Sequence, residues 1–136
     1  MEALKDFSWI RQLSLYAKER FELRGFHIAL VAVPATETHH DGRFRYRLLA
    51  MDPILGRPVL AVDLESDILG DYCLSVELAE GRRVLARYDE LPKLEDFRTA
   101  ALAEAERTLP RGGGAGRGGA GPAKRSPRKA GPRSSR

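Results

Sequence analysis

The fold of this chain is decided by residues 43–65, RFRYRLLAMDPILGRPVLAVDLE. The stretch contains two runs in which apolar and charged side chains alternate, Arg43 to Met51 and Val59 to Glu65. Alternation with a period of two indicates a half-buried β-strand. Between the runs, Asp52-Pro53 and Gly56 are residues typical of a turn. The stretch therefore predicts two neighbouring strands of one antiparallel sheet.

Three further runs extend this sheet. Phe26 to Ala35 is rich in apolar and β-branched residues on both faces. A strand there needs cover from a helix on one side and from a second helix or another subunit on the other. Tyr72 to Ala79 and Arg82 to Tyr88 alternate again, joined by the turn residues Glu80-Gly81, and Ser66 to Asp71 is a short connector. Together the runs predict about five strands.

Helical periodicity precedes and follows the strands. From Leu4 to Arg24 apolar residues recur at steps of three and four, and Gly25 stands where a helix would end. The apolar positions of this run are Phe7, Ile10, Leu13, Ala17 and Phe21. Leu94 to Leu109 repeats the pattern between Pro92 and Pro110. Because the links are short, we predict an α+β fold, an antiparallel meander of about five strands flanked by an N-terminal and a C-terminal helix.

Charge divides the chain at Pro110. Residues 111–136 hold eight of the 23 Lys and Arg residues and no acidic residue, which leaves 15 against 19 Asp and Glu in residues 1–110. The net charge of residues 1–110 is therefore −4. Residues 111–136 are rich in Gly and almost free of apolar side chains, so they cannot bury enough surface to offset their ordering entropy. We predict an acidic globular domain, 1–110, and a disordered Gly/Arg/Pro-rich basic tail, 111–136.

The basic tail has the composition of a polyanion-binding segment. A polycation binds phosphate by releasing counterions and needs no fixed geometry. With all eight charges on duplex phosphate, log K would fall against log salt with a slope of about −7. The predicted nucleic-acid-binding residues are Arg111, Arg117, Lys124, Arg125, Arg128, Lys129, Arg133 and Arg136. The alternative is a solubilising extension with no specific partner.

Two short motifs lie in the tail. Gly116-Arg117-Gly118-Gly119 resembles the RGG boxes of RNA-associated proteins, which implies RNA binding. Ser126-Pro127-Arg128-Lys129 resembles basic motifs of histone tails and also a proline-directed phosphorylation site, which implies modification of Ser126. A phosphate there adds about −1.5 to −2 charges and weakens anion binding.

Arginines recur on the polar side of the predicted sheet. They are Arg43, Arg45, Arg47, Arg83 and Arg87. The carboxylates expected on the same face are Asp63, Glu65 and Glu77. Because opposite charges pair across neighbouring strands, we predict a solvated, ion-paired face rather than a phosphate-binding track.

No group of residues predicts catalysis. His39-His40-Asp41 combines three ligand types, but adjacent residues of a turn seldom converge on one metal ion, so we expect a solvated turn. Cys73 has no identifiable His partner and is interpreted as a structural cysteine, and His27 is expected to pack at the start of a strand. We predict no enzymatic activity, no metal and no cofactor.

The remaining features concern the compartment. One cysteine excludes an intramolecular disulfide, and the first residues have no basic segment followed by an apolar run. The longest apolar stretch, Ile28 to Val33, is far shorter than the ~20 residues that cross a bilayer. We expect a cytoplasmic protein, or a nuclear or nucleoid-associated one, with no membrane partner.

These observations predict a non-catalytic binding or adaptor module. Residues 1–110 would bind a protein partner or form a homodimer, and the tail would contact RNA, DNA or another polyanion. The alternative comes from the element order helix, three strands, connector, two strands, helix, which resembles the small dimeric chaperones of type III secretion and implies a protein-binding chaperone or adaptor. Residues 43–109 also resemble the Pur-type nucleic-acid-binding repeat, four strands and then a helix.

Overall fold

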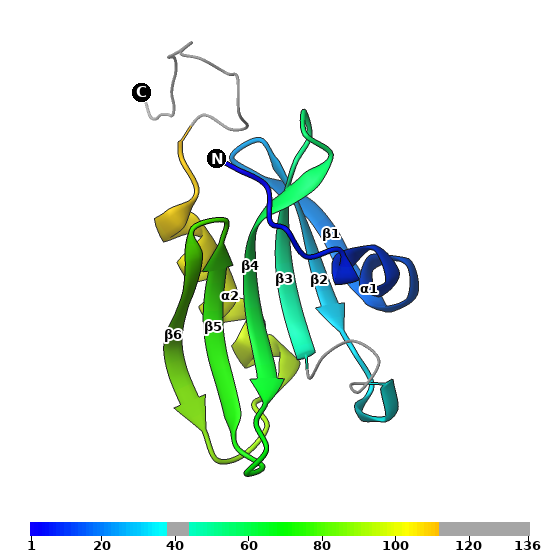
Figure 1. Ribbon diagram of the computed structural model, residues 1–136, viewed down its shortest axis with the longest axis vertical. Helices are drawn as coiled ribbons and strands as arrows, with labels where there is room; N and C mark the ends of the chain where they lie inside the picture. The colour runs from blue at the N-terminus through cyan, green and yellow to red at the C-terminus, as the bar shows by residue number, and fades with distance from the viewer. Residues whose placement is uncertain (38–43, 112–136) are drawn as a thin grey trace, which may run out of the picture.

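The computed structural model describes residues 1–37 and 44–111. Its centre is one antiparallel sheet of six strands, each paired with the next along the chain (Figure 1). The strands are β1 (Ala17–Leu23), β2 (Phe26–Ala32), β3 (Phe44–Asp52), β4 (Arg57–Ser66), β5 (Tyr72–Leu78) and β6 (Gly81–Tyr88). The helices are α1 (Ser8–Tyr16), α2 (Leu94–Thr108) and the short 3-10 helix η1 (Ala35–Glu37). The predicted α+β meander with a helix at each end is confirmed, with six strands in place of about five.

The sixth strand, β1, corrects the prediction of a single helix from Leu4 to Arg24. The helix ends at Tyr16, and burial then alternates along β1, with Phe21 and Leu23 packed against the main core. Leu23 pairs with Phe26, so a two-residue turn, Arg24-Gly25, joins β1 to β2. Both turn residues have positive φ, 54° and 85°, which is the type I′ geometry that matches the twist of a hairpin. Gly25 therefore ends a strand rather than a helix.

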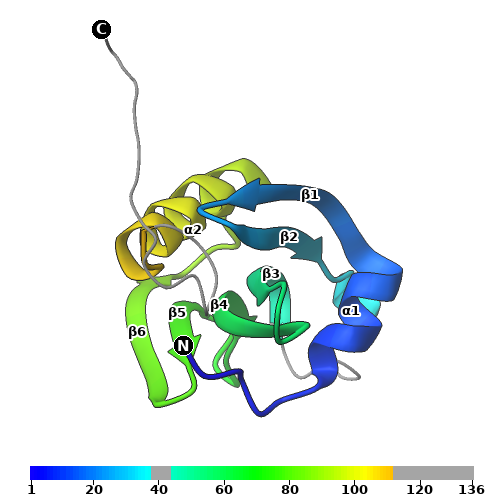
Figure 2. The same ribbon diagram turned by 90° about the horizontal axis from the view of Figure 1, so that it is seen from above.

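One face of the sheet holds the main core and α2. Helix α2 inserts Phe97, Ala101 and Ala105 among the apolar side chains of the strands. It also reaches both edges, because Arg98 pairs with Glu19 of β1 and Glu104 pairs with Arg83 of β6. Figure 2 shows the sheet curving around this helix. The curvature encloses α2 and leaves the other face on the outside.

The outer face is covered in part by α1 and the segment before it. A second cluster there joins Leu4, Val31, Val33, Leu49 and Ala61, with Trp9, Leu13 and Tyr16 packed against it. The Leu4 amide donates a hydrogen bond to the Pro58 carbonyl at 2.8 Å, which fastens the N-terminal segment to β4. The Phe26–Ala35 strand was expected to need a helix on one side and a second helix or another subunit on the other; α2 covers its inner side and α1 covers part of its outer side. No helix among the described residues is long and apolar enough to cross a membrane.

Candidate functional site

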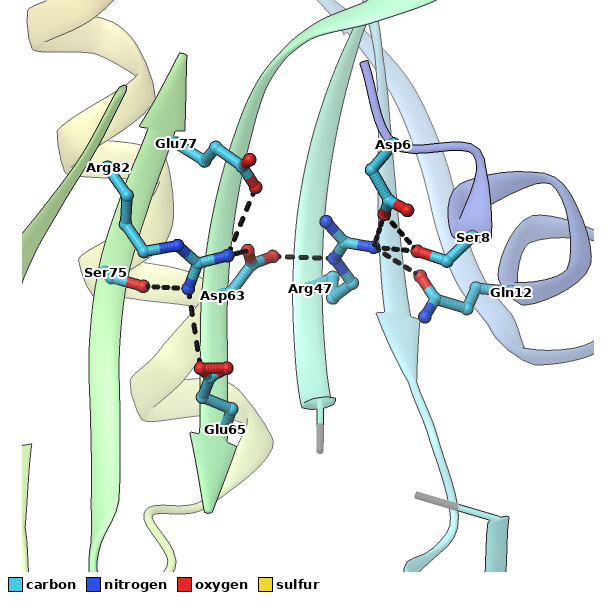
Figure 3. Close-up of polar contacts among 9 residues, drawn as sticks. All are labelled: Asp6, Ser8, Gln12, Arg47, Asp63, Glu65, Ser75, Glu77 and Arg82. Carbon is cyan, nitrogen blue, oxygen red and sulfur yellow. Dashed lines mark hydrogen bonds and ion pairs between the residues drawn. The ribbon is translucent and has the colours of Figure 1, made fainter. Parts of the chain in front are cut away.

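Among the described residues, the buried cluster with the most charged side chains lies on the outer face, under α1 (Figure 3). Its centre is Arg47, whose side chain is 1% exposed. The Arg47 Nε donates to Asp63 Oδ1 at 2.7 Å, across the β3–β4 pair. The Arg47 Nη1 donates to Gln12 Oε1 at 2.8 Å and to Ser8 Oγ at 3.0 Å. Two strands and the first turns of α1 are thus tied together by one guanidinium group.

Arg82 extends this group toward the edge of the sheet. The Arg82 Nη2 lies 3.3 Å from Asp63 Oδ2 and 3.2 Å from Glu77 Oε1, and its Nη1 donates to Ser75 Oγ at 2.9 Å. Glu65 Oε1 is 3.5 Å from the same Nη1. Both oxygens of Asp63 are therefore occupied, one by each arginine.

The sequence predicted ion pairing on this face, and the pairs of Asp63, Glu65 and Glu77 with arginines confirm it. The prediction that the whole face is solvated is wrong. Arg47 and Asp63 are buried, because α1 packs over β2 and β3 and brings Gln12 and Ser8 to the guanidinium. The part over β4 to β6 is open to solvent, and Arg82, Glu65 and Glu77 there are each about one-third exposed.

The prediction that Arg83 belongs to this face is also wrong. A β-bulge in β6 pairs Val84 with Ser75 and Ala86 with Leu74. The residues of β6 before the bulge therefore project from the opposite face of the sheet to the one that simple alternation predicts. Arg82 therefore joins the outer face, and Arg83 turns to the inner one, where its Nη2 lies 2.9 Å from Glu104 Oε2. Arg87 lies opposite Cys73 and is exposed.

Of the other two arginines of the predicted set, the structure describes only Arg45, which does not join the buried group. Arg45 donates its Nε to the Val33 carbonyl at 3.4 Å. Arg43 lies outside the described residues.

The electrostatics of Asp63 follow from its burial between two arginines. Burial raises the pKa of the Asp63 carboxyl above its ordinary value, whereas the charges of Arg47 and Arg82 act in the opposite direction. A perturbed carboxyl can mark an active site, but one with both oxygens bonded to arginines has no free lone pair directed at a substrate. The arrangement acts as a structural tie between α1 and the sheet.

Two further carboxylates hold α2 against the sheet. Glu19 receives two hydrogen bonds from Arg98, at 2.8 Å each, and this contact lowers the pKa of Glu19. Burial by itself would raise the pKa of Glu104, but hydrogen bonds from Arg107 and Thr108 keep it below the ordinary value. Both groups are ionised partners of arginines at neutral pH.

Of the residues considered for metal binding or catalysis, the structure describes Cys73 and His27, which lie on the non-adjacent strands β5 and β2. Among the residues that the structure describes, no three His, Cys, Asp or Glu side chains are placed to hold a metal ion. Cys73 is a free, half-buried cysteine. His27 is exposed, contrary to the expectation that it packs, because it projects from β2 beside Glu22 of the edge strand. The turn His39-His40-Asp41 lies outside the described residues.

Of the predicted nucleic-acid-binding residues, only Arg111 belongs to the described part of the chain, and it is exposed just after α2. The other seven, Arg117, Lys124, Arg125, Arg128, Lys129, Arg133 and Arg136, lie outside the described residues, as does Ser126. Arg24 holds the end of α2, because its Nη1 donates to the Leu109 carbonyl at 3.0 Å and also to the Glu106 carbonyl. These bonds fix the end of α2 beside the β1–β2 turn.

Sequence reasoning missed Gln12 and Ser8 as partners of Arg47. A signal was present, since Gln12 lies one residue before Leu13 of the apolar stripe, and a polar side chain beside such a stripe must find a partner when it is buried.

Comparison with known proteins found no match: the chain matches no protein-family model, no curated protein and no solved structure.

Proposed function

We propose that this chain is a non-catalytic binding module in which residues 111–136 contact nucleic acid or another polyanion and residues 1–110 bind a protein partner. The observation that carries the proposal is the distribution of free positive charge. Residues 1–110 have a net charge of −4, and residues 111–136 carry eight positive charges and no negative one.

The ion pairs of the folded domain support this distribution. In the part of the domain that the structure describes, the arginines engaged with carboxylates include Arg11, Arg47, Arg82, Arg83, Arg98 and Arg107. Positive charge that is already paired attracts phosphate weakly, because a new contact must compete with the existing carboxylate. The cations best able to release counterions from a nucleic acid are therefore those beyond Pro110.

The C-terminal end of α2, after which residues 111–136 follow in the chain, also favours the proposal. Arg24 and Arg107 lie at the C-terminal end of α2, and Arg111 follows it directly. Positive side chains complement the negative end of a helix dipole. A polyanion bound to residues 111–136 would therefore meet Arg24 and Arg111 at this end of α2, whereas Arg107 is already paired with Glu104, and Glu106 is in the same last turns of the helix.

The test compares two full-length proteins, wild type and a variant with the seven Lys and Arg residues from Arg117 to Arg136 changed to Gln. Binding to a duplex DNA and to a single-stranded RNA is measured by fluorescence anisotropy at several salt concentrations. We expect the wild type to bind with a steep negative salt slope, at most about −7 on duplex DNA, and the variant to lose most of that slope. A double variant of exposed body residues, Lys18→Gln with Arg87→Gln, is the matched control. Equal binding by wild type and the sevenfold variant, or none by either, contradicts the proposal.

The second candidate is a small dimeric chaperone or adaptor that binds proteins through the folded domain. Three large apolar side chains on and beside α1 favour it, because Phe7, Ile10 and Leu15 are each more than half exposed. Light scattering after size exclusion separates the candidates. A strict monomer whose behaviour is unchanged by Ile10→Ser and Leu15→Ser argues against a dimer through α1.

A further inference from the structure

The outer face of the sheet contains a pocket of about 480 Å³ beside α1. Its walls come from the end of α1, from β1 to β3 and from the β3–β4 turn at Pro53 and Gly56. The pocket exists because α1 ends at Tyr16 and covers only part of this face, and because β2 contributes the small side chain of Ala29 there. Volumes of about 300–1,000 Å³ are typical of small-molecule sites.

Strand register explains which side chains meet in the pocket. Ala29 lies opposite Arg20, and His27 lies opposite both Glu22 and Met51, so these residues project from the same face of the sheet. Leu13 of α1 lines the pocket together with them. The lining therefore sets the apolar side chains of Leu13, Ala29 and Met51 beside the polar side chains of Arg20, Glu22, His27 and Asp52.

The charged groups differ in how far they are already engaged. His27 Nδ1 lies 3.8 Å from Glu22 Oε2, which gives each a partner. The Asp52 carboxylate accepts hydrogen bonds from the amides of Ile54 and Leu55 in the β3–β4 turn. Arg20 donates only to the Leu13 carbonyl, at 3.3 Å, and no carboxylate in the described part of the chain pairs with it. Arg20 is thus the positive charge of this pocket that an anionic ligand would meet, whereas Glu22 is a mostly exposed carboxylate at its edge.

We propose that this pocket binds a small amphipathic carboxylic acid. The apolar body of the ligand lies over Leu13, Ala29 and Met51, and its carboxylate accepts hydrogen bonds from the guanidinium of Arg20. A guanidinium presents two parallel donors that match the two oxygens of a carboxylate. Since Arg20 is exposed to water, the contact is expected to increase affinity by about tenfold over a neutral ligand of the same length.

The test uses the full chain, which has two methionines, Met1 and Met51. With ¹³C-methyl-labelled methionine, Met51 reports on the pocket and Met1 is the internal control. Decanoate and decanol are titrated separately, both below the concentrations at which they aggregate. We expect a saturable shift of the Met51 signal with both ligands, no shift of Met1, and about tenfold tighter binding of decanoate.

Two variants separate the role of Arg20 from general surface charge. Arg20→Gln keeps a donor for the Leu13 carbonyl and removes the charge, so decanoate should bind no more tightly than decanol. Lys18→Gln lies on the same strand outside the pocket lining and should leave both affinities unchanged. Because Arg20 and Lys18 are exposed, both variants are expected to fold.

Three results would overturn the proposal: no saturable Met51 shift, equal affinities for decanoate and decanol in the wild type, or unchanged decanoate binding by Arg20→Gln. A Met51 shift that follows protein concentration without added ligand would instead show that a second copy fills the pocket, and would overturn it as well.

Discussion

Arg47 and Asp63 form a buried ion pair across β3 and β4, with the Nε and Oδ1 atoms 2.7 Å apart and both side chains at most 1% exposed. A buried pair of this kind stabilises little compared with an apolar pair of the same shape, but the loss of one member is costly because the other charge is left uncompensated.

The pair therefore predicts a difference between single and double variants. Arg47→Met should lower the free energy of unfolding by about 3–5 kcal/mol, because Asp63 would remain buried with Arg82 as its one arginine partner. The double variant, Arg47→Met with Asp63→Leu, should lose less of the free energy of unfolding than Arg47→Met alone. Urea unfolding followed by circular dichroism measures both, and a double variant less stable than Arg47→Met would refute this account of the pair.

The β-bulge in β6 predicts unequal roles for its arginines. Arg82 contacts Asp63, Glu77 and Ser75, so Arg82→Gln should cost about 1 kcal/mol, discounted because the side chain is one-third exposed. Arg87→Gln, on the same strand and exposed, should change stability by less than about 0.5 kcal/mol. The same urea experiment ranks the two variants, and equal losses would contradict the assigned register.

The contacts of α2 predict acid sensitivity. The pKa of Glu104 is lowered in the folded protein from its ordinary value of 4.5, so the unfolded chain takes up the proton first as the pH falls. The stabilising contribution of Glu104 is complete above pH 4.5 and is lost as the pH falls through its lower folded pKa. Thermal unfolding between pH 3 and pH 6 should show a weaker pH dependence for Glu104→Gln than for the wild type. An identical pH dependence would exclude Glu104 as a source of the effect.

Phosphorylation predicts a change in the proposed polyanion binding. Phosphate on Ser126 adds about −1.5 to −2 charges among the basic residues 124–129, so nucleic-acid binding should weaken and the salt slope should become shallower by up to about two units. Ser126→Glu should act in the same direction with about half the effect. Anisotropy titrations of the wild type, Ser126→Ala and Ser126→Glu measure the nucleic-acid affinity and its salt slope. Tighter binding by Ser126→Glu than by Ser126→Ala would be inconsistent with contact through this segment.

The strands were predictable from sequence where one face is apolar and the other polar, as in β3, β4 and β5. The N-terminal region was not, because Phe7, Ile10, Leu13, Ala17 and Phe21 fit helical spacing while Phe21 and Leu23 also fit a strand. The ambiguity is resolved by the pairing of β1 with β2, a contact that local periodicity does not contain.

The buried polar group was predictable only in part. The placement of Arg47 and Asp63 on one face followed from the alternation of the two strands, and the register that sets them opposite each other is given by the structure. Its burial depends on where α1 lies, and the participation of Arg82 depends on a bulge that shifts the register by one residue. Both are tertiary features that no local pattern encodes.

The attachment of α2 to both edges of the sheet has a consequence for how the chain folds. Every strand pairing in the described part of the chain joins neighbours in sequence, so these pairings close short loops and can form early. The contact of Glu19 with Arg98 instead spans 79 residues, and it connects the first strand to the last helix. We therefore expect α2 to dock late, after the hairpins have formed, and a nascent chain to keep its inner apolar face exposed until α2 has left the ribosome.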